Sequence, residues 1–280
     1  MVKMITAVAA LTAGIALADV TSQNVVGYNT KNLQAETWYI VSFQFAGVGD
    51  NATVDLNKVF KSSGIKATSW NDGDCDNGRS AEIQVRQKNG TYKHYYYISD
   101  GTDLDDEDLG YDCWCDADGY PLDTDDIIAL GNGAWMYIPN YSTLAGETPS
   151  ISVSGEVFAQ ATLGVDVVGN LEWNLIGNPW PIALDLNTKL DMEGFIPGSW
   201  NDGDCDTGNC TEIQVRQLNG TYKHFYYISD GTDLDDEDLG YDCWCDADGY
   251  PPEGAAMQSL EGAWMRVRTT DNEVTVPFSK

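Results

Sequence analysis

The stretch EIQVRQKNGTYKHYYYI, residues 82–98, holds two runs of high strand propensity on either side of Asn89-Gly90. Asn-Gly is the strongest short signal for a β-hairpin, because both positions of a two-residue turn need a positive φ. The same stretch recurs at 212–228 with two substitutions. The sequence therefore predicts two equivalent β-hairpins, one in each half of the chain.

A two-residue turn at this place would also fix the pairing of the two strands. It would put Val85 opposite His94 and Ile83 opposite Tyr96. Alternation along the strands then predicts one face toward the core and one face outward. The expected core-facing residues are Ile83, Val85, Tyr92, His94, Tyr96 and Ile98. The expected outward residues are Arg86, Lys93, Tyr95 and Tyr97.

The hairpin lies inside a longer repeat, in which 199–250 repeats 69–120. The copies differ only at Asn77/Thr207, Arg79/Asn209, Ser80/Cys210, Ala81/Thr211, Lys88/Leu218 and Tyr95/Phe225. Further strands are predicted at 24–28, 37–45, 133–138 and 150–158, and one short helix at 54–61. Many short strands separated by turn signals predict an all-β fold of two tandem homologous domains, each a β-sandwich or barrel-like.

The first eighteen residues, MVKMITAVAALTAGIALA, have the pattern of a secretory signal peptide. Lys3 precedes an apolar run, and Ala16-Leu17-Ala18 is a small-x-small cleavage site. We therefore expect a secreted or cell-surface protein with a signal peptide at 1–18 and β-domains at 19–150 and 151–280. No later apolar stretch reaches spanning length, so no transmembrane segment is expected in the mature chain.

The charge balance narrows the classes of partner. Asp and Glu number 44 against 15 Lys and Arg, a formal net charge of −29. This balance argues against nucleic acid, which needs a basic footprint, and against anionic lipid surfaces. It favours divalent cations, basic partners or colloidal solubility. An aromatic content of 11% indicates a packed protein rather than an acidic disordered chain.

Short framework motifs lie around the repeat: SQNVVGY at 22–28, SGEV at 154–157, and GAWM at 133–136 and 262–265. This framework resembles a family of secreted bacterial tandem-domain β-proteins without an assigned biochemical role. The resemblance covers most of the mature chain. It implies a secreted β-fold and supplies no catalytic residues.

Carboxylates are concentrated in two clusters in each repeat. DGDCD stands at 72–76 and 202–206, and SDGTDLDDEDLGYDCWCDADGY stands unchanged at 99–120 and 229–250. Alternate Asp residues on a turning loop supply the oxygens that calcium needs, although neither cluster is an EF-hand loop. The candidate ligands of calcium or another divalent cation are Asp72, Asp74, Asp76, Asp112, Asp116, Asp118, Asp202, Asp204, Asp206, Asp242, Asp246 and Asp248. The alternatives are a solvated acidic loop that keeps the protein soluble, or carboxylates neutralised by Arg86 and Lys93.

The cysteines are disulfide candidates, because disulfides are the default in an exported protein. They are Cys75, Cys113 and Cys115 in the first repeat and Cys205, Cys210, Cys243 and Cys245 in the second. A bridge from Cys75 to Cys113 or Cys115 would pin the two acidic clusters together. Cys113 and Cys115 alternate along a strand, so we expect them to be poorly placed to bond each other.

The extra Cys210 allows two bridges in the second repeat. The first repeat keeps an odd thiol, which is either free or links two chains. A rival interpretation is zinc, held by three cysteines with His94 or His224.

Four aromatic residues are candidates for stacking on a ligand such as a sugar: Trp114, Trp244, Tyr95 and Tyr97. Trp135 and Trp264 are expected in the core. Paired carboxylates can hydrolyse glycosides, but a hydrolase needs two carboxyl groups in unlike environments. Here whole acidic clusters are duplicated, so no such pair stands out. The sequence carries no nucleophile-elbow, zinc-protease or nucleotide-binding motif, so no enzyme is predicted.

The sequence thus predicts a secreted, non-catalytic extracellular protein with a structural or adhesive role. Its acidic loops would bind calcium or other divalent cations, and the chain would self-assemble as a homo-oligomer or attach to extracellular matrix. Two equivalent sites in one chain suit such multivalent attachment. The alternative is a tandem carbohydrate-binding protein that attaches to glycans.

Overall fold

The computed structural model describes eight stretches of the chain: 26–46, 53–99, 110–122, 128–158, 160–200, 203–229, 240–254 and 256–280. Within these residues the chain forms antiparallel sheets with only short helical turns, so the predicted all-β class is confirmed. The arrangement is sandwich-like, because separate sheets cover a common core. No helix in the described stretches is long and apolar enough to cross a membrane.

The first half of the chain contains two short helical turns among its strands. Its elements are β1 (Val26–Asn32), β2 (Trp38–Ser42), β3 (Phe45–Ala46), β4 (Thr53–Val54), α1 (Leu56–Val59), β5 (Phe60–Ser63), β6 (Glu82–Arg86), β7 (Tyr92–Ile98), β8 (Cys113–Cys115), β9 (Ile128–Ala129), β10 (Gly133–Tyr137), the 3-10 turn η1 (Asn140–Ser142) and β11 (Ser150–Val157). The strands predicted within 37–45, 133–138 and 150–158 are present, and the predicted helix at 54–61 is the single turn α1.

The second half repeats this plan with fewer short strands. Its elements are β12 (Thr162–Val168), β13 (Asn174–Gly177), α2 (Leu186–Lys189), β14 (Thr211–Arg216), β15 (Tyr222–Ile228), β16 (Cys243–Asp246), β17 (Gly262–Arg266) and β18 (Glu273–Ser279). Asp185 caps α2 by accepting a hydrogen bond from the backbone N–H of Asn187, as short polar residues do at helix N-termini.

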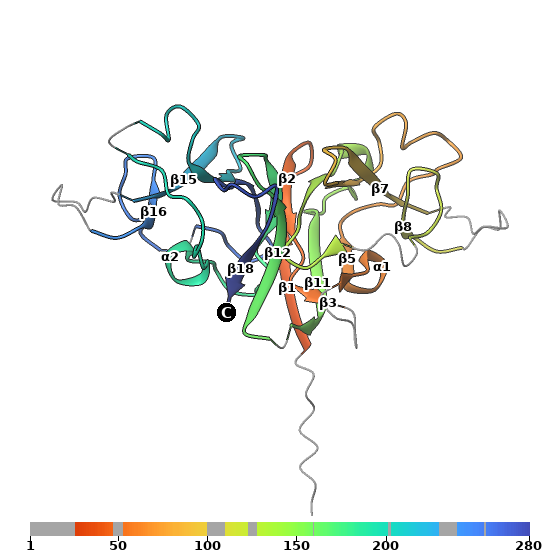
Figure 1. The fold of residues 1–280 in the computed structure, drawn as a ribbon. Helices are drawn as coiled ribbons and strands as arrows, with labels where there is room; N and C mark the ends of the chain where they lie inside the picture. Colours follow the sequence, from red (N-terminus) through yellow and green to blue (C-terminus); the bar gives the residue numbers. More distant parts are fainter. Residues whose placement is uncertain are drawn as a thin grey trace, which may run out of the picture.

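The two halves build the same five-stranded antiparallel sheet. The strand order is β2-β10-β6-β7-β8 in the first half and β13-β17-β14-β15-β16 in the second. Smaller sheets pair β1, β3 and β5 with β11, β12 with β18, and β4 with β9. Figure 1 shows the halves as two wings around a central group of strands, with β8 and β16 at opposite outer ends.

Strand β11 pairs with β1, β3 and β5, which all belong to the first half. Ser150 lies opposite Asn32, and Glu156 lies opposite Val26. The expected domain boundary between residues 150 and 151 therefore falls at the first residue of this strand. The next strand, β12, pairs along its length with the C-terminal strand β18.

The hairpin register predicted from the sequence is wrong by one residue. Val85 lies opposite Lys93 and Ile83 opposite Tyr95, because the loop holds three residues, Lys88 to Gly90. Gly90 adopts a φ of 86°, as the last residue of a three-residue loop with a bulge does.

A slip of one residue moves every side chain of a strand to the other face. Tyr95 therefore points into the core and is 2% exposed, whereas Tyr92, His94 and Tyr96 lie on the outer face. The tyrosines and the histidine of β7 thus exchange the faces predicted for them. Ile98 shares the outer face but is buried there in a separate cluster with Cys113 and Cys115, and Lys93 shares the face of Tyr95 but is exposed near the hairpin loop.

One continuous hydrophobic core runs through both halves of the chain. Ile83 and Met136 contribute to it from the first half, and Ile213 and Met265 from the second; all four are fully buried. Two repeats that share a core stabilise each other, since each buries apolar surface that the other would otherwise expose to water.

The glycines of the two GAWM motifs lie at the seam between the halves. A Cβ atom on Gly133 would come within 2.4 Å of the carbonyl oxygen of Ile176, and one on Gly262 within 2.9 Å of the same oxygen. A Cβ atom on Gly177 would lie 2.5 Å from the Cβ atom of Ser42. Glycine is needed at these positions because the two backbones approach too closely for a side chain.

Candidate functional site

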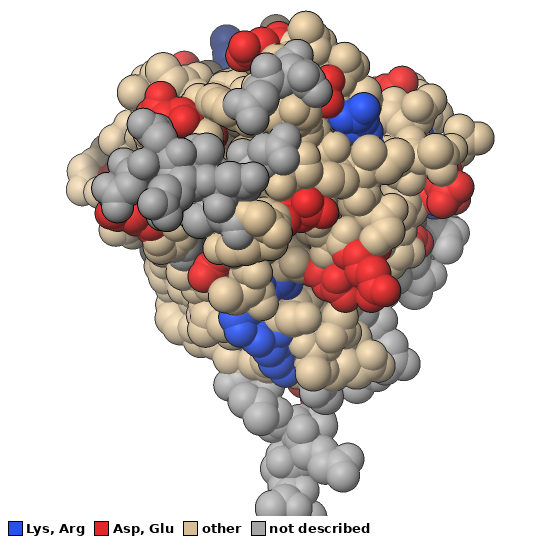
Figure 2. All heavy atoms as spheres, turned by 60° about the vertical axis from the view of Figure 1, so that its left-hand side comes forward, with Lys and Arg blue, Asp and Glu red and all other residues tan. Residues whose placement is uncertain are grey.

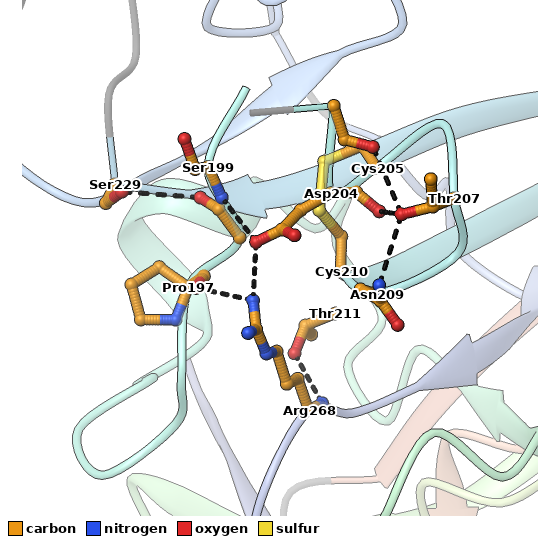
Figure 3. A network of polar contacts seen from close by, with 12 residues as sticks. Pro197, Ser199, Asp204, Cys205, Thr207, Asn209, Cys210, Thr211, Ser229 and Arg268 are labelled. Atoms are coloured by element: carbon orange, nitrogen blue, oxygen red, sulfur yellow. Dashed lines mark hydrogen bonds and ion pairs between the residues drawn. A yellow bond between two sulfur atoms is a disulfide. The ribbon is translucent and has the colours of Figure 1, made fainter. Parts of the chain in front are cut away.

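The first acidic cluster of each repeat is a tight turn held by its own carboxylate. In the second repeat, Asp204 Oδ2 accepts a hydrogen bond from the backbone N–H of Ser199 (3.1 Å) and pairs with Arg268 Nη1 (2.8 Å) (Figure 3). The Ser199 hydrogen bond and then the Arg268 side chain lower the pKa of Asp204. In the first repeat, Asp74 accepts the matching hydrogen bond from the backbone N–H of Ser69.

The cation that faces this carboxylate differs between the repeats. Arg79 Nη1 lies 3.4 Å from Asp74 Oδ1, and its place in the second repeat is taken by Asn209. There Arg268 reaches Asp204 from beyond β17. Both carboxylates are therefore neutralised by a guanidinium group of the chain itself.

The second acidic cluster also closes on itself. Asp116 Oδ1 accepts hydrogen bonds from the backbone N–H groups of Asp118 and Tyr120, both at 2.9 Å. Asp246 makes the same pair of bonds in the second repeat. The Asp116 and Asp246 side chains, both predicted to bind a cation, thus stabilise the turn by accepting hydrogen bonds from its backbone.

The remaining predicted cation ligands lie at the surface. Asp72, Asp76, Asp112, Asp118, Asp206, Asp242 and Asp248 are exposed. Asp202 and the acidic stretches 100–109 and 230–239 lie outside the described residues. Among the residues that the structure describes, no three His, Cys, Asp or Glu side chains are grouped so that they could hold a metal ion. Cation binding therefore stays a prediction.

Acidic side chains are spread over the face of the molecule that Figure 2 draws. Figure 2 shows them on one face in several separate groups among uncharged residues, with basic side chains at only a few places. This pattern is typical of a surface that keeps a highly charged protein soluble.

The disulfide in the structure lies inside the acidic turn of the second repeat. Cys205 and Cys210 form it, with a Cα–Cα distance of 4.9 Å. The predicted bridge between Cys75 and Cys113 or Cys115 is not formed. The acidic turn is thus closed within itself and is not tied to the second acidic cluster.

The other cysteines are buried in two small clusters, one in each repeat. Cys75, Cys113 and Cys115 pack with Trp70 and Tyr96, and burial raises the pKa of the Cys75 thiol. As expected, Cys113 and Cys115 form no disulfide with each other, although their sulfur atoms lie 3.3 Å apart, and the same holds for Cys243 and Cys245. The rival zinc set is not assembled among the described residues, because His94 instead pairs with Glu82 at 2.5 Å.

The aromatic residues predicted to stack on a ligand pack into or against the core. Trp114 and Trp244 are each 1% exposed, and Tyr95 is 2% exposed. Tyr97 is half-buried and packs on Trp114 with ring centroids 5.4 Å apart. Their register in the sheet turns these four rings inward, so the structure does not present them as a stacking surface.

A different row of aromatic rings lies on the outer face of the two large sheets. Trp38, Trp135, Trp264 and Trp173 follow one another with ring centroids 6.1, 6.2 and 6.3 Å apart. All four are half-buried. The contact between Trp135 and Trp264 joins the two repeats, so the row is continuous across the seam. We call these four residues the tryptophan row.

The rings of the tryptophan row stand edge to face. The planes of Trp38 and Trp135 meet at 88°, those of Trp135 and Trp264 at 66°, and those of Trp264 and Trp173 at 74°. Tyr137 adds a ring that is stacked on Trp38 at 4.9 Å. Successive perpendicular rings make a ridged strip rather than a flat platform.

Each repeat places an arginine over a tryptophan of the other repeat. The Arg216 guanidinium lies 5.5 Å from the ring centroid of Trp135, and that of Arg86 lies 6.0 Å from that of Trp264. Arg216 Nε also donates to the carbonyl oxygen of Trp38 at 2.9 Å. An open pocket of about 350 Å³ lies here, lined by Trp38, Gln84, Tyr92, Trp135 and Arg216.

Polar side chains border the tryptophan row on the same face. In the first repeat Glu82 accepts a hydrogen bond from Gln84 (2.9 Å) and pairs with His94. In the second repeat Glu212 does the same with Gln214 and His224, and Arg266 adds an ion pair at 2.6 Å. Burial and the Glu82 carboxylate raise the pKa of Tyr96 to about 12. The face therefore offers rings and hydrogen-bonding groups together.

The sequence predicts Trp135 and Trp264 in the core, and this prediction is wrong because both are half-buried on the outer face. A signal was present in GAWM: alternation puts Ala134 and Met136 on one face and Trp135 on the other. Since Ala134 and Met136 are fully buried, Trp135 has to face outward.

Comparisons with protein-family models, with curated proteins and with solved structures find no match for this chain. The resemblance of its framework motifs to the secreted tandem-domain β-proteins therefore stays a prediction. The functional interpretation therefore rests on the positions and contacts of the residues in the structure.

Proposed function

We propose that this chain is a secreted, non-catalytic carbohydrate-binding protein that holds a glycan chain along the tryptophan row. The observation that carries this proposal is the continuity of four half-buried tryptophan rings across both repeats. Half-buried indole rings present a rigid apolar face and keep little entropy to lose on binding. Sugar rings have apolar C–H faces that suit such surfaces, and their hydroxyl groups need nearby polar partners.

Those polar partners are available beside the rings. Gln84 lines the open pocket together with Trp38 and Trp135. Gln214 holds the equivalent place in β14, opposite Trp264. A glycan lying on the row would thus meet amide groups in both repeats, as ligands do in binding sites with a few convergent polar groups.

The perpendicular rings favour a single flexible glycan chain over a crystalline surface. A flat crystal face can contact several rings at once only if they are coplanar. The angles of 66° to 88° between successive rings prevent this. A single chain can rotate about its linkages and follow the ridged strip.

Secretion is part of the proposal. The signal-peptide pattern at 1–18 and the Cys205–Cys210 disulfide both fit an oxidising compartment outside the cytoplasm. Attachment to a glycan matrix gives such a protein its adhesive or structural role. Calcium binding by the acidic loops is a separate expectation that does not depend on the tryptophan row.

Binding to a panel of soluble oligosaccharides, followed by calorimetry, tests the proposed function. We expect Trp135→Ala and Trp264→Ala each to weaken binding about 10-fold or more, since truncating a central aromatic contact costs on the order of 1–3 kcal/mol. Tyr141→Ala is the matched control, because this tyrosine is exposed but lies outside the row. Equal losses in all three variants, or no glycan binding at all, would contradict the proposal.

A further inference from the structure

We infer that the glycan is anionic, and that Arg86 and Arg216 bind its carboxylate or sulfate groups. This inference rests on the proposed function and names the class of its ligand. It starts from the charge of the chain, which has 44 acidic residues against 15 basic ones. In a chain with this excess of acidic residues, most arginine side chains are expected to form an ion pair with a carboxylate.

Arg86 and Arg216 form no ion pair with a carboxylate in the described part of the chain. Among the described residues, Arg79, Arg266 and Arg268 pair with Asp74, Glu212 and Asp204. No carboxylate in the described part of the chain lies within ion-pair distance of Arg86 or Arg216. These two guanidinium groups are the two that cross the seam onto the tryptophan row.

Acidic residues near these arginines are already engaged: Asp166, which lines a cavity with Arg86, accepts a hydrogen bond from Thr275, and Glu261, which lines one with Arg216, pairs with Lys31. Glu82 is bound by Gln84 and His94, and Glu212 by Gln214, His224 and Arg266. Arg216 is the one charged residue among the described residues that line the open pocket. The pocket is therefore locally basic within a strongly acidic protein.

The geometry suits an acidic sugar better than an acidic peptide. Contact with Trp135 and Trp264 orients each guanidinium plane, and a planar fork binds carboxylate or sulfate through two parallel hydrogen bonds. In the open pocket, Trp38 and Trp135 offer rings for stacking and Arg216 offers a fork for the acid. A uronic acid or sulfated sugar carries both matching features on one residue, namely an apolar ring face and an anionic group.

Cation–π contact alone would give the arginines a purely structural role. That role and the inferred one differ in a measurable way. A structural arginine affects acidic and neutral glycans alike, whereas a binding arginine affects only the acidic ones. The comparison therefore needs two ligands that differ only in charge.

Calorimetry with an acidic oligosaccharide and its carboxyl-reduced counterpart supplies that comparison. The acidic probes are oligogalacturonate and oligomannuronate, each reduced to a neutral oligomer with the same linkage, and a sulfated oligosaccharide with its desulfated form. We expect at least one acidic probe to bind about 10-fold or more tightly than its neutral partner, and this advantage to shrink as salt screens it. In the double variant Arg86→Gln/Arg216→Gln, both members of the pair should bind alike.

The outcomes separate the inference from the proposed function. Equal binding of every acidic probe and its neutral partner overturns the inference and leaves glycan binding intact. Failure of every glycan overturns both. Binding of a synthetic peptide GTDLDDEDLG, taken from residues 101–110, in place of any acidic glycan would also overturn the inference, because it assigns the arginines to a second copy of this chain.

Trp38→Ala is the second variant, because Trp38 lines the pocket and offers Arg216 only its backbone carbonyl, which alanine keeps. It should weaken the acidic and the neutral probe by the same factor, since it removes a ring and leaves both guanidinium groups in place. Thermal melting of each variant shows whether the fold is intact. Loss of charge discrimination in Trp38→Ala, with discrimination retained in the double arginine variant, would reverse the assigned roles and contradict the inference.

Discussion

Cys75 Sγ lies 3.2 Å from Ser80 Oγ, at the place where the second repeat closes the Cys205–Cys210 disulfide. The backbone of the two turns is the same: the N–H of Asp74 bonds to the carbonyl of Ser69, and that of Asp204 to the carbonyl of Ser199. One substitution, Ser80 for Cys210, therefore replaces a covalent bond by a hydrogen bond without changing the turn.

This equivalence predicts that the disulfide can be exchanged between the repeats. Ser80→Cys should create a new bridge to Cys75, and Cys210→Ser should leave Cys205 free. The bridge closes a short loop, so each change should shift the free energy of unfolding by about 2 kcal/mol, upward in the first case and downward in the second. Peptide mapping without reduction and chemical denaturation measure both. A Ser80→Cys protein in which Cys75 stays a free thiol would refute the equivalence.

The contrast between Trp114 and Trp135 gives a second prediction. Trp114→Ala removes a fully buried ring and should cost about 3–5 kcal/mol of stability. Trp135→Ala removes a half-buried ring on the outer face and should cost about 1 kcal/mol while weakening glycan binding. Denaturant unfolding and calorimetry measure the two effects. The opposite ranking in stability would show that the row, and not Trp114, belongs to the core.

The seam glycines predict where the repeats are most sensitive to added volume. Gly262→Ala puts a methyl group against Ile40 and the Ile176 carbonyl, so the two halves have to separate. We expect a loss of about 1–3 kcal/mol in the free energy of unfolding, as for other overpacked sites. Gly220→Ala is a poor control, because a φ of 85° strains any residue with a side chain. Gly164→Ala is the better control, because its added methyl group would meet only the side-chain methyl of Thr275. Gly164→Ala should cost clearly less, and equal costs would argue against a tight seam.

Acid should weaken the turn of the second repeat through Asp204. Hydrogen bonding to Ser199 and the contact with Arg268 lower the pKa of Asp204 in the folded protein. A carboxyl group with a lowered folded pKa stabilises the fold above its unfolded value of about 4, and this contribution disappears as pH falls through the folded pKa. Asp204→Asn should therefore lower the melting temperature at about pH 6 and have little effect at about pH 2.

Asp206→Asn is the control for this measurement, because Asp206 is an exposed neighbour in the same turn. Its effect on melting should be small across the same range of pH. If Asp204→Asn and Asp206→Asn behaved alike near neutral pH, the hydrogen bonds of Asp204 would contribute nothing to stability.

Calcium is the cation expected in the acidic loops, and melting tests it directly. The mature protein is melted in EGTA, in millimolar calcium and in millimolar magnesium. At a free calcium concentration a hundred times the Kd, each site would add about 2.7 kcal/mol to the free energy of unfolding and raise the melting temperature by several degrees. A calcium-specific rise would assign the duplicated acidic stretches to ion binding. Identical melting curves would mean that the carboxylates of the acidic clusters bind no calcium and are either solvated or paired with side chains such as Arg79 and Arg268.

The sequence alone determined the all-β class, the two hairpins and the equivalence of the two repeats. These features depend on local rules: strand propensity, turn-forming Asn-Gly pairs and repetition of a segment can be seen without knowing any distant contact. Alternation also showed which side chains share a face, as Ala134 and Met136 do. It did not show which face is buried, because a one-residue change in loop length exchanges the two faces of Tyr92–Ile98.

Only the tertiary structure decided the site. Trp135 and Trp264 are 129 positions apart in the chain and meet because the two large sheets come together across a seam of glycines. Arg86 and Arg216 acquire their places on the tryptophan row from the opposite repeat in the same way. Contacts between the repeats depend on how two sheets pack around a common core, and no local pattern within either repeat contains that information.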